Sequence, residues 1–539
     1  MKTSIPSKIQ YLLLSILSGL LLWASWPTSP LTFLIFIAFI PIIILAERIE
    51  KVATYALLTF LSLLVWNVGT TWWVGNTPVP ASGVFANIFN SMLMLFPLLA
   101  FRGTLHRFGK PVGYLSLVVY WLTFEHIHYN WELSWPWLTV GNVFAMHPNW
   151  IQWYEYTGSS GGTLWVLLVN ILIYRAVLYA FTDQKVKKKL LQFIVPAAII
   201  SIPILLGPSL RFIGTFILKA RSIEVVIVQP NIDPYDEKFD AGSSLEQLNH
   251  LLELTSRKIT SNTRYIIWPE TALFTTSVQE NRINQTLELR SIRNFLQSYP
   301  DATIITGAVT YKFYTAGEEI PSTSRVTENG DHYDVFNSAL QIDTSQAVQI
   351  YHKSKLVPGV ELIPYLRYFS FLKDLALDFG GITGSYGRNG GVPFFSNPKY
   401  DINTLPLICY ESVYSEYVAE TVRKGPNFIA IITNDGWWGD TQGYKQHLQY
   451  ARIRAIETRR WIARSANTGS SAFISPSGAI IDPQPYWQAS VISYNLKTLP
   501  FQTFYVKYGD YLAKISVLIT LALLVYSIVH RIIQRRKHV

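Results

Sequence analysis

The sequence predicts two kinds of fold in one chain, a multi-span α-helical membrane domain and an α/β domain. Half of the 539 residues are hydrophobic and only 15% are charged, whereas about a quarter are charged in a usual globular protein. Over residues 221–500, short β-branched runs alternate with polar helical patterns, which favours a layered α/β domain. We therefore expect a transmembrane helical domain at residues 1–220, an α/β domain at 221–500, and a last transmembrane helix with a basic tail at 501–539.

Apolar runs long enough to cross a bilayer predict the membrane spans. Lys2 and Lys8 precede the first run, as in a signal peptide, but further apolar runs follow and no small-residue cleavage site is obvious, so we expect a retained helix. The pattern predicts about eight spans, about seven before the long polar region and one after it. The runs cover residues 11–26, 31–46, 53–74, 84–101, 112–127, 163–181, 190–206 and 512–529.

Lysines and arginines lie in every second loop between these runs, and basic residues near span ends are retained in the cytoplasm. The loops at 27–30, 75–83 and 128–162 contain neither residue. This alternation predicts that both termini are cytoplasmic and that residues 221–500 lie outside. It also accounts for the net charge of +10, so we expect no nucleic-acid partner. The basic loop residues are Lys2, Lys8, Arg48, Lys51, Arg102, Arg107, Lys110, Lys185, Lys187, Lys188, Lys189, Arg531, Arg535, Arg536 and Lys537.

The loop at residues 128–162 is crowded with aromatic residues, and two hypotheses explain it. Its rings either form an aromatic belt at the lipid–water boundary or lie beside a substrate entrance. Glu125, near the outer end of a predicted span, either lines a wet cavity or lies at the interface. The aromatic residues are Trp131, Trp135, Trp137, Trp150, Trp153, Tyr154 and Tyr156.

Within residues 221–500, β-branched runs predict strands and 3.6-residue periodicity predicts helices. We expect strands at 223–229, 265–268, 303–309, 336–342, 405–409, 427–433 and 471–475. We expect helices at 243–259, 285–297, 413–422 and 443–462.

Cys409 is the only cysteine, and it ends a buried strand pattern just before a helical one. A single cysteine excludes an internal disulfide. Backbone N–H groups at the start of a helix can lower the pKa of a thiol and stabilise an oxyanion. A lone cysteine in an apolar strand is more often a small buried hydrophobe, so the hypothesis of a nucleophile depends on its partners.

Glu270 and Lys353 also follow predicted strands and complete a coherent chemical set. The acid would take the thiol proton, the thiolate would attack an acyl carbon, and the ammonium would stabilise the oxyanion. Glu361 would keep Lys353 charged. The alternatives are a surface helix cap for Glu270 and a solvated loop for the lysine. We expect no metal and no cofactor, because no His/Cys/Asp cluster has ligand spacing.

Trp-Pro-Glu at 268–270, Lys353 with Leu-Val-Pro and Glu361, and Cys-Tyr-Glu at 409–411 resemble the Glu-Lys-Cys catalytic set of the nitrilase superfamily. The stretches at 432–439, 447–457 and 465–469 match it as well. Together with the predicted spans, the chain resembles the bacterial apolipoprotein N-acyltransferase family along nearly its whole length. This resemblance implies a nitrilase-like α-β-β-α sandwich for the catalytic domain.

The resemblance implies that Cys409 takes an acyl chain from a phospholipid as a thioester and passes it to the α-amine of a lipoprotein's N-terminal diacylglyceryl-cysteine. Glu270 would be the general base, Lys353 would stabilise the oxyanion, and Glu361 would support Lys353. Further residues would shape the site or touch lipid. They are Tyr410 and Glu411 beside the nucleophile, and Trp437, Trp438 and Phe239 as lipid or substrate contacts.

The resemblance also implies a multi-pass protein of the bacterial inner membrane, with the catalytic domain on the periplasmic side. One departure affects the supporting acid, because Pro358-Gly-Val-Glu361 stands where the family usually has Pro-Phe-Gly-Glu. Two other functions use the same fold. One is a membrane-tethered amidase that passes the acyl group of a small amide to water, and the other is a catalytically silent lipid-binding or scaffold protein.

Overall fold

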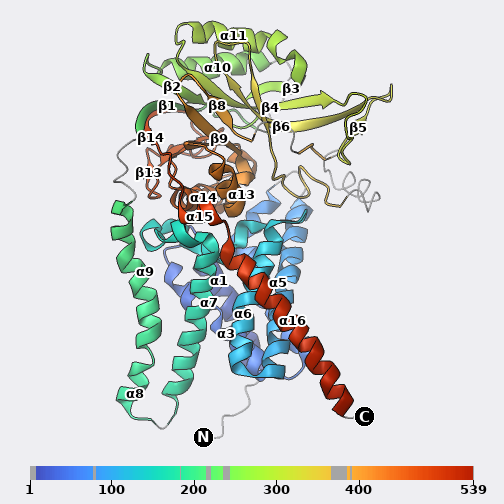
Figure 1. Cartoon of the computed structure of the whole chain (residues 1–539), viewed down its shortest axis with the longest axis vertical. Helices are drawn as coiled ribbons and strands as arrows, with labels where there is room; N and C mark the ends of the chain where they lie inside the picture. Colours follow the sequence, from blue (N-terminus) through green and yellow to red (C-terminus); the bar gives the residue numbers. More distant parts are fainter. Residues whose placement is uncertain are drawn as a thin grey trace. The chain divides into compact units, whose positions relative to one another are not determined.

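The computed structural model describes residues 8–76, 80–182, 184–213, 220–234, 243–365, 385–388, 391 and 393–537. The chain divides into two compact units (Figure 1). Unit 1 comprises residues 1–74, 83–211 and 508–539, and unit 2 comprises residues 75–82 and 212–507.

Unit 1 is helical. Among the described residues, five helical segments are long and apolar enough to cross a membrane: Val52–Gly75, Gly83–Phe108, Tyr154–Ala180, Val186–Leu210 and Tyr511–Gln534. They coincide with five of the predicted spans, and the predicted first span is a shorter apolar helix. The helices are α1 (Lys8–Ala24), α2 (Ile35–Ala38), α3 (Ile40–Arg48), α4 (Val52–Thr71), α5 (Pro80–Phe108), α6 (Lys110–Tyr129), α7 (Tyr154–Ala180), α8 (Val186–Leu191), α9 (Ile194–Ile213) and α16 (Tyr511–Lys537).

The predicted span at 31–46 is not one helix, because α2 ends at Ala38 and α3 begins at Ile40. Asn170 of α7, which is fully buried, occupies the break. Its Oδ1 accepts the Phe39 N–H at 2.9 Å, and its Nδ2 donates to the Ile35 carbonyl at 2.8 Å. These are the two groups that an unbroken helix would join to each other, so one side chain replaces the missing hydrogen bond.

Glu125 is buried in unit 1 and joins three segments. Its Oε1 accepts hydrogen bonds from the Val140 N–H at 2.8 Å and from Trp121 Nε1 at 3.0 Å. Its Oε2 accepts one from Thr163 Oγ1 at 2.8 Å. The aromatic loop contains short 3₁₀ turns at Pro136–Leu138, Val140–Met146 and Pro148–Trp150. Trp137 is buried inside the unit. For the more exposed rings, both hypotheses stay predictions.

Unit 2 contains two β-sheets. Within the described residues, the first sheet has eight strands in the order β14-β1-β2-β4-β6-β5, with β3 beside β4 and β7 beside β6. The second has six strands in the order β13-β12-β11-β10-β9-β8. The first sheet consists of β1 (Arg221–Gln229), β2 (Thr263–Ile267), β3 (Leu273–Gln279), β4 (Thr303–Phe313), β5 (Arg325–Val326), β6 (His332–Ile342), β7 (Gln349–His352) and β14 (Ser490–Thr498). The second consists of β8 (Phe395–Asn397), β9 (Ile402–Ile408), β10 (Phe428–Thr433), β11 (Ile462–Ala466), β12 (Ala472–Ile474) and β13 (Ile480–Ile481).

Each sheet is covered on its outer face by helices (Figure 1), and the short helix α15 (Phe504–Tyr508) adds Tyr505 and Val506 to the core of the second. Alternate residues of a strand face opposite sides, so Val226 and Val228 pack under α10 (Ser244–Ser256) and α11 (Leu287–Gln297). The second sheet packs against α13 (Ser415–Arg423) and α14 (Gln442–Thr458). The inner faces of the two sheets pack against each other, as the Tyr265 and Phe428 rings show, whose centroids lie 5.1 Å apart. This order of layers confirms the predicted α-β-β-α sandwich.

The predicted helix at 443–462 is too long. α14 ends at Thr458, and Arg459 adopts a left-handed conformation with φ 49° that no α-helix can continue. Ile462 then begins β11, which pairs in parallel with β10. Six further strands among the described residues, β3, β5, β7, β8, β13 and β14, lie outside the strand predictions.

We predict that Asn170→Leu destabilises unit 1 by about 1–2 kcal/mol, because the Phe39 N–H and the Ile35 carbonyl lose their partner inside an apolar environment. Thermal unfolding of the detergent-solubilised protein measures this change. Asn130→Leu is the matched control, since Asn130 is exposed and bonds only within its own helix end. Equal melting temperatures for the two variants would show that the bridge contributes nothing.

Candidate active site

Cys409 lies where β9 meets the next turn. β9 ends at Ile408, Cys409 begins a 3₁₀ turn that runs to Val413, and α13 starts at Ser415. The residue is 8% exposed and has φ 52°, a left-handed conformation that costs a non-glycine residue about 1–2 kcal/mol. The predicted strand at 405–409 therefore ends one residue too late, and a short turn that starts at the cysteine separates the strand from the helix.

Glu411 fixes this turn from inside. The side chain is fully buried, and its Oε2 accepts the Ile408 N–H at 2.8 Å. Its Oε1 accepts the Ser354 N–H at 2.6 Å, and the Tyr351 hydroxyl donates to it at 2.8 Å. One carboxylate thus binds the strand before Cys409 to the segment that carries Lys353.

Lys353 follows β7 and is 1% exposed. Its Nζ donates to Glu361 Oε1 at 2.8 Å and to Glu270 Oε1 at 3.4 Å. Burial lowers the pKa of Lys353, but the carboxylates of Glu361 and Glu270 outweigh burial and raise that pKa above its usual value. The lysine is therefore an ammonium held between two acids.

The backbone before Glu361 reaches this position by a tight turn. Gly359 has φ 81°, which suits glycine, and its N–H bonds the Leu362 carbonyl at 2.8 Å. Glu361 Oε2 also accepts the Val357 N–H at 2.8 Å. The unusual Pro-Gly-Val-Glu sequence thus still delivers its carboxylate to Lys353.

Asn337 of β6 is a part of the site that the sequence analysis missed. Its Nδ2 donates to Glu270 Oε1 at 2.8 Å and to Glu361 Oε1 at 3.0 Å, so the amide binds the same two acids as the lysine. Asn337 is 4% exposed, and its strand contains other polar residues, so no signal in the sequence singled it out.

Glu270 is placed by the turn after β2. The Gly307 N–H donates to the Pro269 carbonyl at 3.0 Å, and a Cβ on Gly307 would lie 2.6 Å from Glu270 Cα. Only glycine permits this close approach. Glu270 Oε2 accepts the Asn434 N–H at 3.1 Å, which ties the acid to the second sheet.

The thiol of Cys409 is protonated at rest. Burial raises its pKa well above the usual value and Glu270 raises it further, while the Lys353 ammonium lowers it. Burial therefore outweighs any lowering of this pKa by backbone N–H groups at the start of the turn. A base must therefore remove the proton during the reaction.

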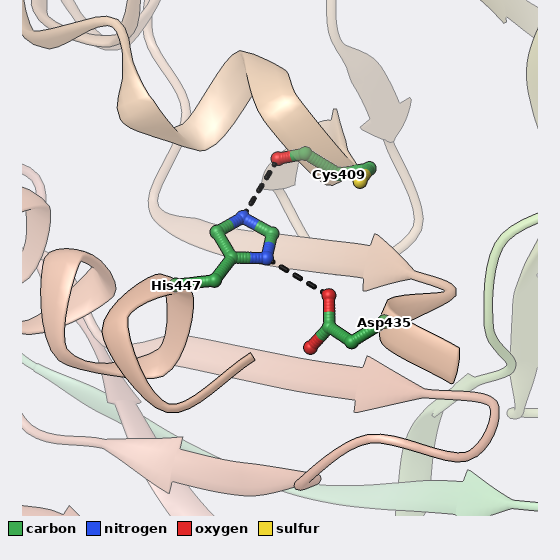
Figure 2. A group of neighbouring side chains, drawn as sticks. All are labelled: Cys409, Asp435 and His447. Atoms are coloured by element: carbon green, nitrogen blue, oxygen red, sulfur yellow. Dashed lines mark hydrogen bonds and ion pairs between the residues drawn. The ribbon is translucent and has the colours of Figure 1, made fainter. Parts of the chain in front are cut away.

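Asp435, His447 and Cys409 come together from three separate segments (Figure 2), and their potential ligand atoms lie within 4.8 Å of one another. The donor set does not fit a resident metal ion. Arg464 Nη2 already donates to Asp435 Oδ2. His447 Nδ1 lies 2.9 Å from Asp435 Oδ1, and its Nε2 lies 3.2 Å from the Cys409 carbonyl oxygen.

The remaining predicted residues lie around this centre or outside it. Tyr410 is buried, and its ring packs on Tyr414 at 5.2 Å. Trp437 and Trp438 belong to a 3₁₀ turn at Asp435–Trp438 that follows β10, and both are partly exposed. Phe239 lies outside the described residues.

The geometry of the site permits either an acyltransferase or an amidase, and comparison with known proteins distinguishes between them. Residues 18–172 match the apolipoprotein N-acyltransferase N-terminal domain, and residues 224–498 match the carbon-nitrogen hydrolase family. The apolipoprotein N-acyltransferase of Chlorobaculum tepidum is 30% identical over 86% of this chain and 86% of its own length.

The chain belongs to the apolipoprotein N-acyltransferase family. The enzyme of that name from Thermotoga maritima is 26% identical over 81% of this chain and 76% of its own length. Among solved structures, a mutant of an amidase from Nesterenkonia AN1 in the nitrilase superfamily is 13% identical, covers 56% of this chain and 98% of its own, and has a TM-score of 0.35.

Membership in the apolipoprotein N-acyltransferase family makes the chain a membrane protein and an N-acyltransferase. The amidase hypothesis is less supported, because the match at residues 18–172 is to the N-terminal domain of the acyltransferases.

We predict that Lys353→Met slows alkylation of Cys409 by iodoacetamide at least about tenfold at pH 8, because the lost ammonium raises the thiol pKa by about one unit or more. The rate-against-pH curve should move to higher pH. Alkylation reports on one site, since the chain has a single cysteine.

Lys355→Met is the matched control for this measurement. Lys355 lies two residues further along, and its Nζ packs over the Tyr414 ring at 5.2 Å rather than between the two acids. An unchanged alkylation curve in Lys353→Met would contradict the electrostatic role of Lys353 toward the thiol.

Proposed function

We propose that this chain transfers a fatty acyl group from a phospholipid, through a thioester on Cys409, to the α-amine of the N-terminal diacylglyceryl-cysteine of bacterial lipoproteins. The observation that carries the proposal is the buried ammonium of Lys353 between Glu270 and Glu361, on a segment that Glu411 joins to the strand and turn of Cys409, the single cysteine of the chain. A base, an oxyanion stabiliser and a nucleophile are the parts that acyl transfer requires.

In the first half-reaction, Glu270 takes the thiol proton and the sulfur attacks the ester carbon of the phospholipid. The oxygen of the tetrahedral intermediate gains negative charge, which Lys353 stabilises. The carbon–oxygen bond to glycerol then breaks, Glu270 returns the proton to the leaving oxygen, and lysophospholipid departs. Cys409 keeps the acyl chain as a thioester.

In the second half-reaction, the lipoprotein α-amine attacks the thioester carbon. Glu270 takes a proton from the amine, Lys353 again stabilises the oxyanion, and the carbon–sulfur bond breaks. Glu270 passes this proton to the departing thiolate, and the acceptor leaves as an amide. The raised pKa of the Cys409 thiol supports the role of Glu270 in the first half-reaction, because a protonated thiol needs a base.

Further residues of the site support these steps. Glu361 and Asn337 orient Lys353 and Glu270 through the hydrogen bonds given above. Glu411 fixes the turn that carries Cys409, and Tyr410 shapes the site beside the nucleophile. The partly exposed rings of Trp437 and Trp438, together with Phe239, are proposed to contact the lipid chains.

A membrane location suits a reaction in which both substrates are lipid-anchored. We propose the bacterial inner membrane, with the catalytic residues 221–500 on the periplasmic side, both termini cytoplasmic, and membrane segments at 1–220 and 501–539. The alternation of basic and uncharged loops supports this orientation.

The test is intact mass spectrometry of the purified protein after incubation with phospholipid alone. We predict one fatty-acyl mass added to the wild type, which hydroxylamine or an amine-bearing diacylated lipopeptide removes. Cys409→Ser should carry no hydroxylamine-labile adduct, because an oxygen ester resists hydroxylamine under conditions that cleave a thioester.

Three outcomes separate the hypotheses. An adduct released by the lipopeptide as its N-acyl product supports transfer to an amine. An adduct released to water equally fast with or without the lipopeptide supports an amidase-like hydrolase. No adduct on folded wild type in excess phospholipid contradicts the phospholipid-donor mechanism.

A further inference from the structure

Asp435, His447 and Arg464 form a buried charged cluster that the acyl-transfer steps leave unused. All three residues are 0% exposed, and they come from the turn after β10, from α14 and from β11. Asp435 Oδ1 accepts a hydrogen bond from Thr433 Oγ1 at 2.8 Å and faces His447 Nδ1 at 2.9 Å. Arg464 holds the other carboxylate oxygen. Asp435, itself held by Thr433 and Arg464, therefore fixes the Nδ1 side of the imidazole.

The opposite side of the imidazole faces the nucleophile residue (Figure 2). Its Nε2 lies 3.2 Å from the Cys409 carbonyl oxygen and 2.9 Å from Ser412 Oγ. Ser412 Oγ also donates to that carbonyl at 2.8 Å. The dashed line in Figure 2 joins the ring to the carbonyl oxygen of Cys409, so the hydrogen bond drawn between these two residues is to the backbone of the cysteine.

Both ring nitrogens are thereby engaged in every protonation state. When Nε2 carries a proton, it donates to the Cys409 carbonyl oxygen. When only Nδ1 is protonated and donates to Asp435, Nε2 accepts the Ser412 hydroxyl, and neither group then donates to the Cys409 carbonyl. The form that positions Cys409 is therefore the one with a proton on Nε2. Neither state leaves a nitrogen for the sulfur, which separates this arrangement from a Cys-His-Asp triad.

Holding the carbonyl matters because Cys409 has φ 52°. A left-handed cysteine is unfavourable on its own, so surrounding contacts must impose it. The orientation of the carbonyl sets the second backbone dihedral of the residue and with it the direction of Cα–Cβ. A displacement of the nucleophile by about 1 Å is enough to slow a reaction about a hundredfold.

We propose that His447, fixed by Asp435 and Arg464, is a positioning residue that holds the Cys409 carbonyl and thereby aims the thiol at the acyl carbon. The inference rests on the proposed function, in which Cys409 is the nucleophile. Glu270 remains the base, and His447 takes no proton from the sulfur.

The experiment measures single-turnover acylation of Cys409 by phospholipid in His447→Ala, His447→Gln and Ser412→Ala, beside wild type. We expect the acylation rate of His447→Ala to fall about a hundredfold. The phospholipid concentration for half-maximal rate and the pH midpoint of the profile should stay unchanged. His447→Gln, whose amide can donate to the carbonyl, should recover at least about a tenth of the wild-type rate.

Iodoacetamide alkylation distinguishes positioning from proton transfer, because this small reagent approaches a thiol from many directions. Positioning predicts an alkylation rate within about threefold of wild type in His447→Ala, whereas a base role predicts that alkylation and acylation fall together. His332→Ala is the matched control at a distant histidine of β6. Ser412→Ala, a smaller change, keeps the test valid if His447→Ala does not fold.

Two results overturn the proposal, and they are distinguishable. A wild-type adduct together with unimpaired acylation in His447→Ala and Ser412→Ala contradicts the inference alone, as does a shifted pH midpoint. The absence of any adduct on wild type contradicts the proposed function and removes the basis of the inference with it.

Discussion

The active site depends on one buried ammonium between two carboxylates. Removing a charged amine from water costs several kcal/mol unless oppositely charged partners surround it, and Lys353 is 1% exposed with Glu361 at 2.8 Å and Glu270 at 3.4 Å. Two acids and one lysine leave a net negative charge. The side-chain amide of Asn337 and backbone N–H groups stabilise this charge by donating hydrogen bonds to the two carboxylates. The same contacts fix both the base and the oxyanion stabiliser. The hydrogen bonds that stabilise the buried charges therefore also set the catalytic geometry.

The two-sheet architecture makes this arrangement possible. Glu270 and Lys353 follow strands of the first sheet, whereas Cys409 follows a strand of the second. The Asn434 N–H and the carboxylate of Glu411 join these strand ends across the two sheets. The acid, the lysine and the thiol therefore come together only when both sheets are formed and packed, and the interior of unit 2 keeps water away from the ammonium.

Residues at strand ends were predictable from the sequence because strand patterns are local. The apolar run before Cys409 and the Trp-Pro-Glu turn each mark where a strand stops, and the family resemblance assigned roles to them. Asn337 and His447 were not predictable in this way, because an amide in a strand or a histidine in a helix gives no local sign of its partner. His447 meets Cys409 across 38 residues. The break at Phe39 has the same cause, since it depends on Asn170 from another helix. The helix ending at Thr458 was overextended because no glycine or proline marks the left-handed Arg459.

The most direct test of this account compares two rates in Lys353→Met, acylation of Cys409 by phospholipid and its alkylation by iodoacetamide, at one pH. Alkylation depends on thiolate formation alone, whereas acylation also passes through an oxyanion. If Lys353 stabilises that oxyanion, acylation should fall about a hundredfold or more beyond the fall in alkylation. Equal losses in the two rates would mean that Lys353 acts only on the ionisation of the thiol, and would contradict its assignment as the oxyanion stabiliser.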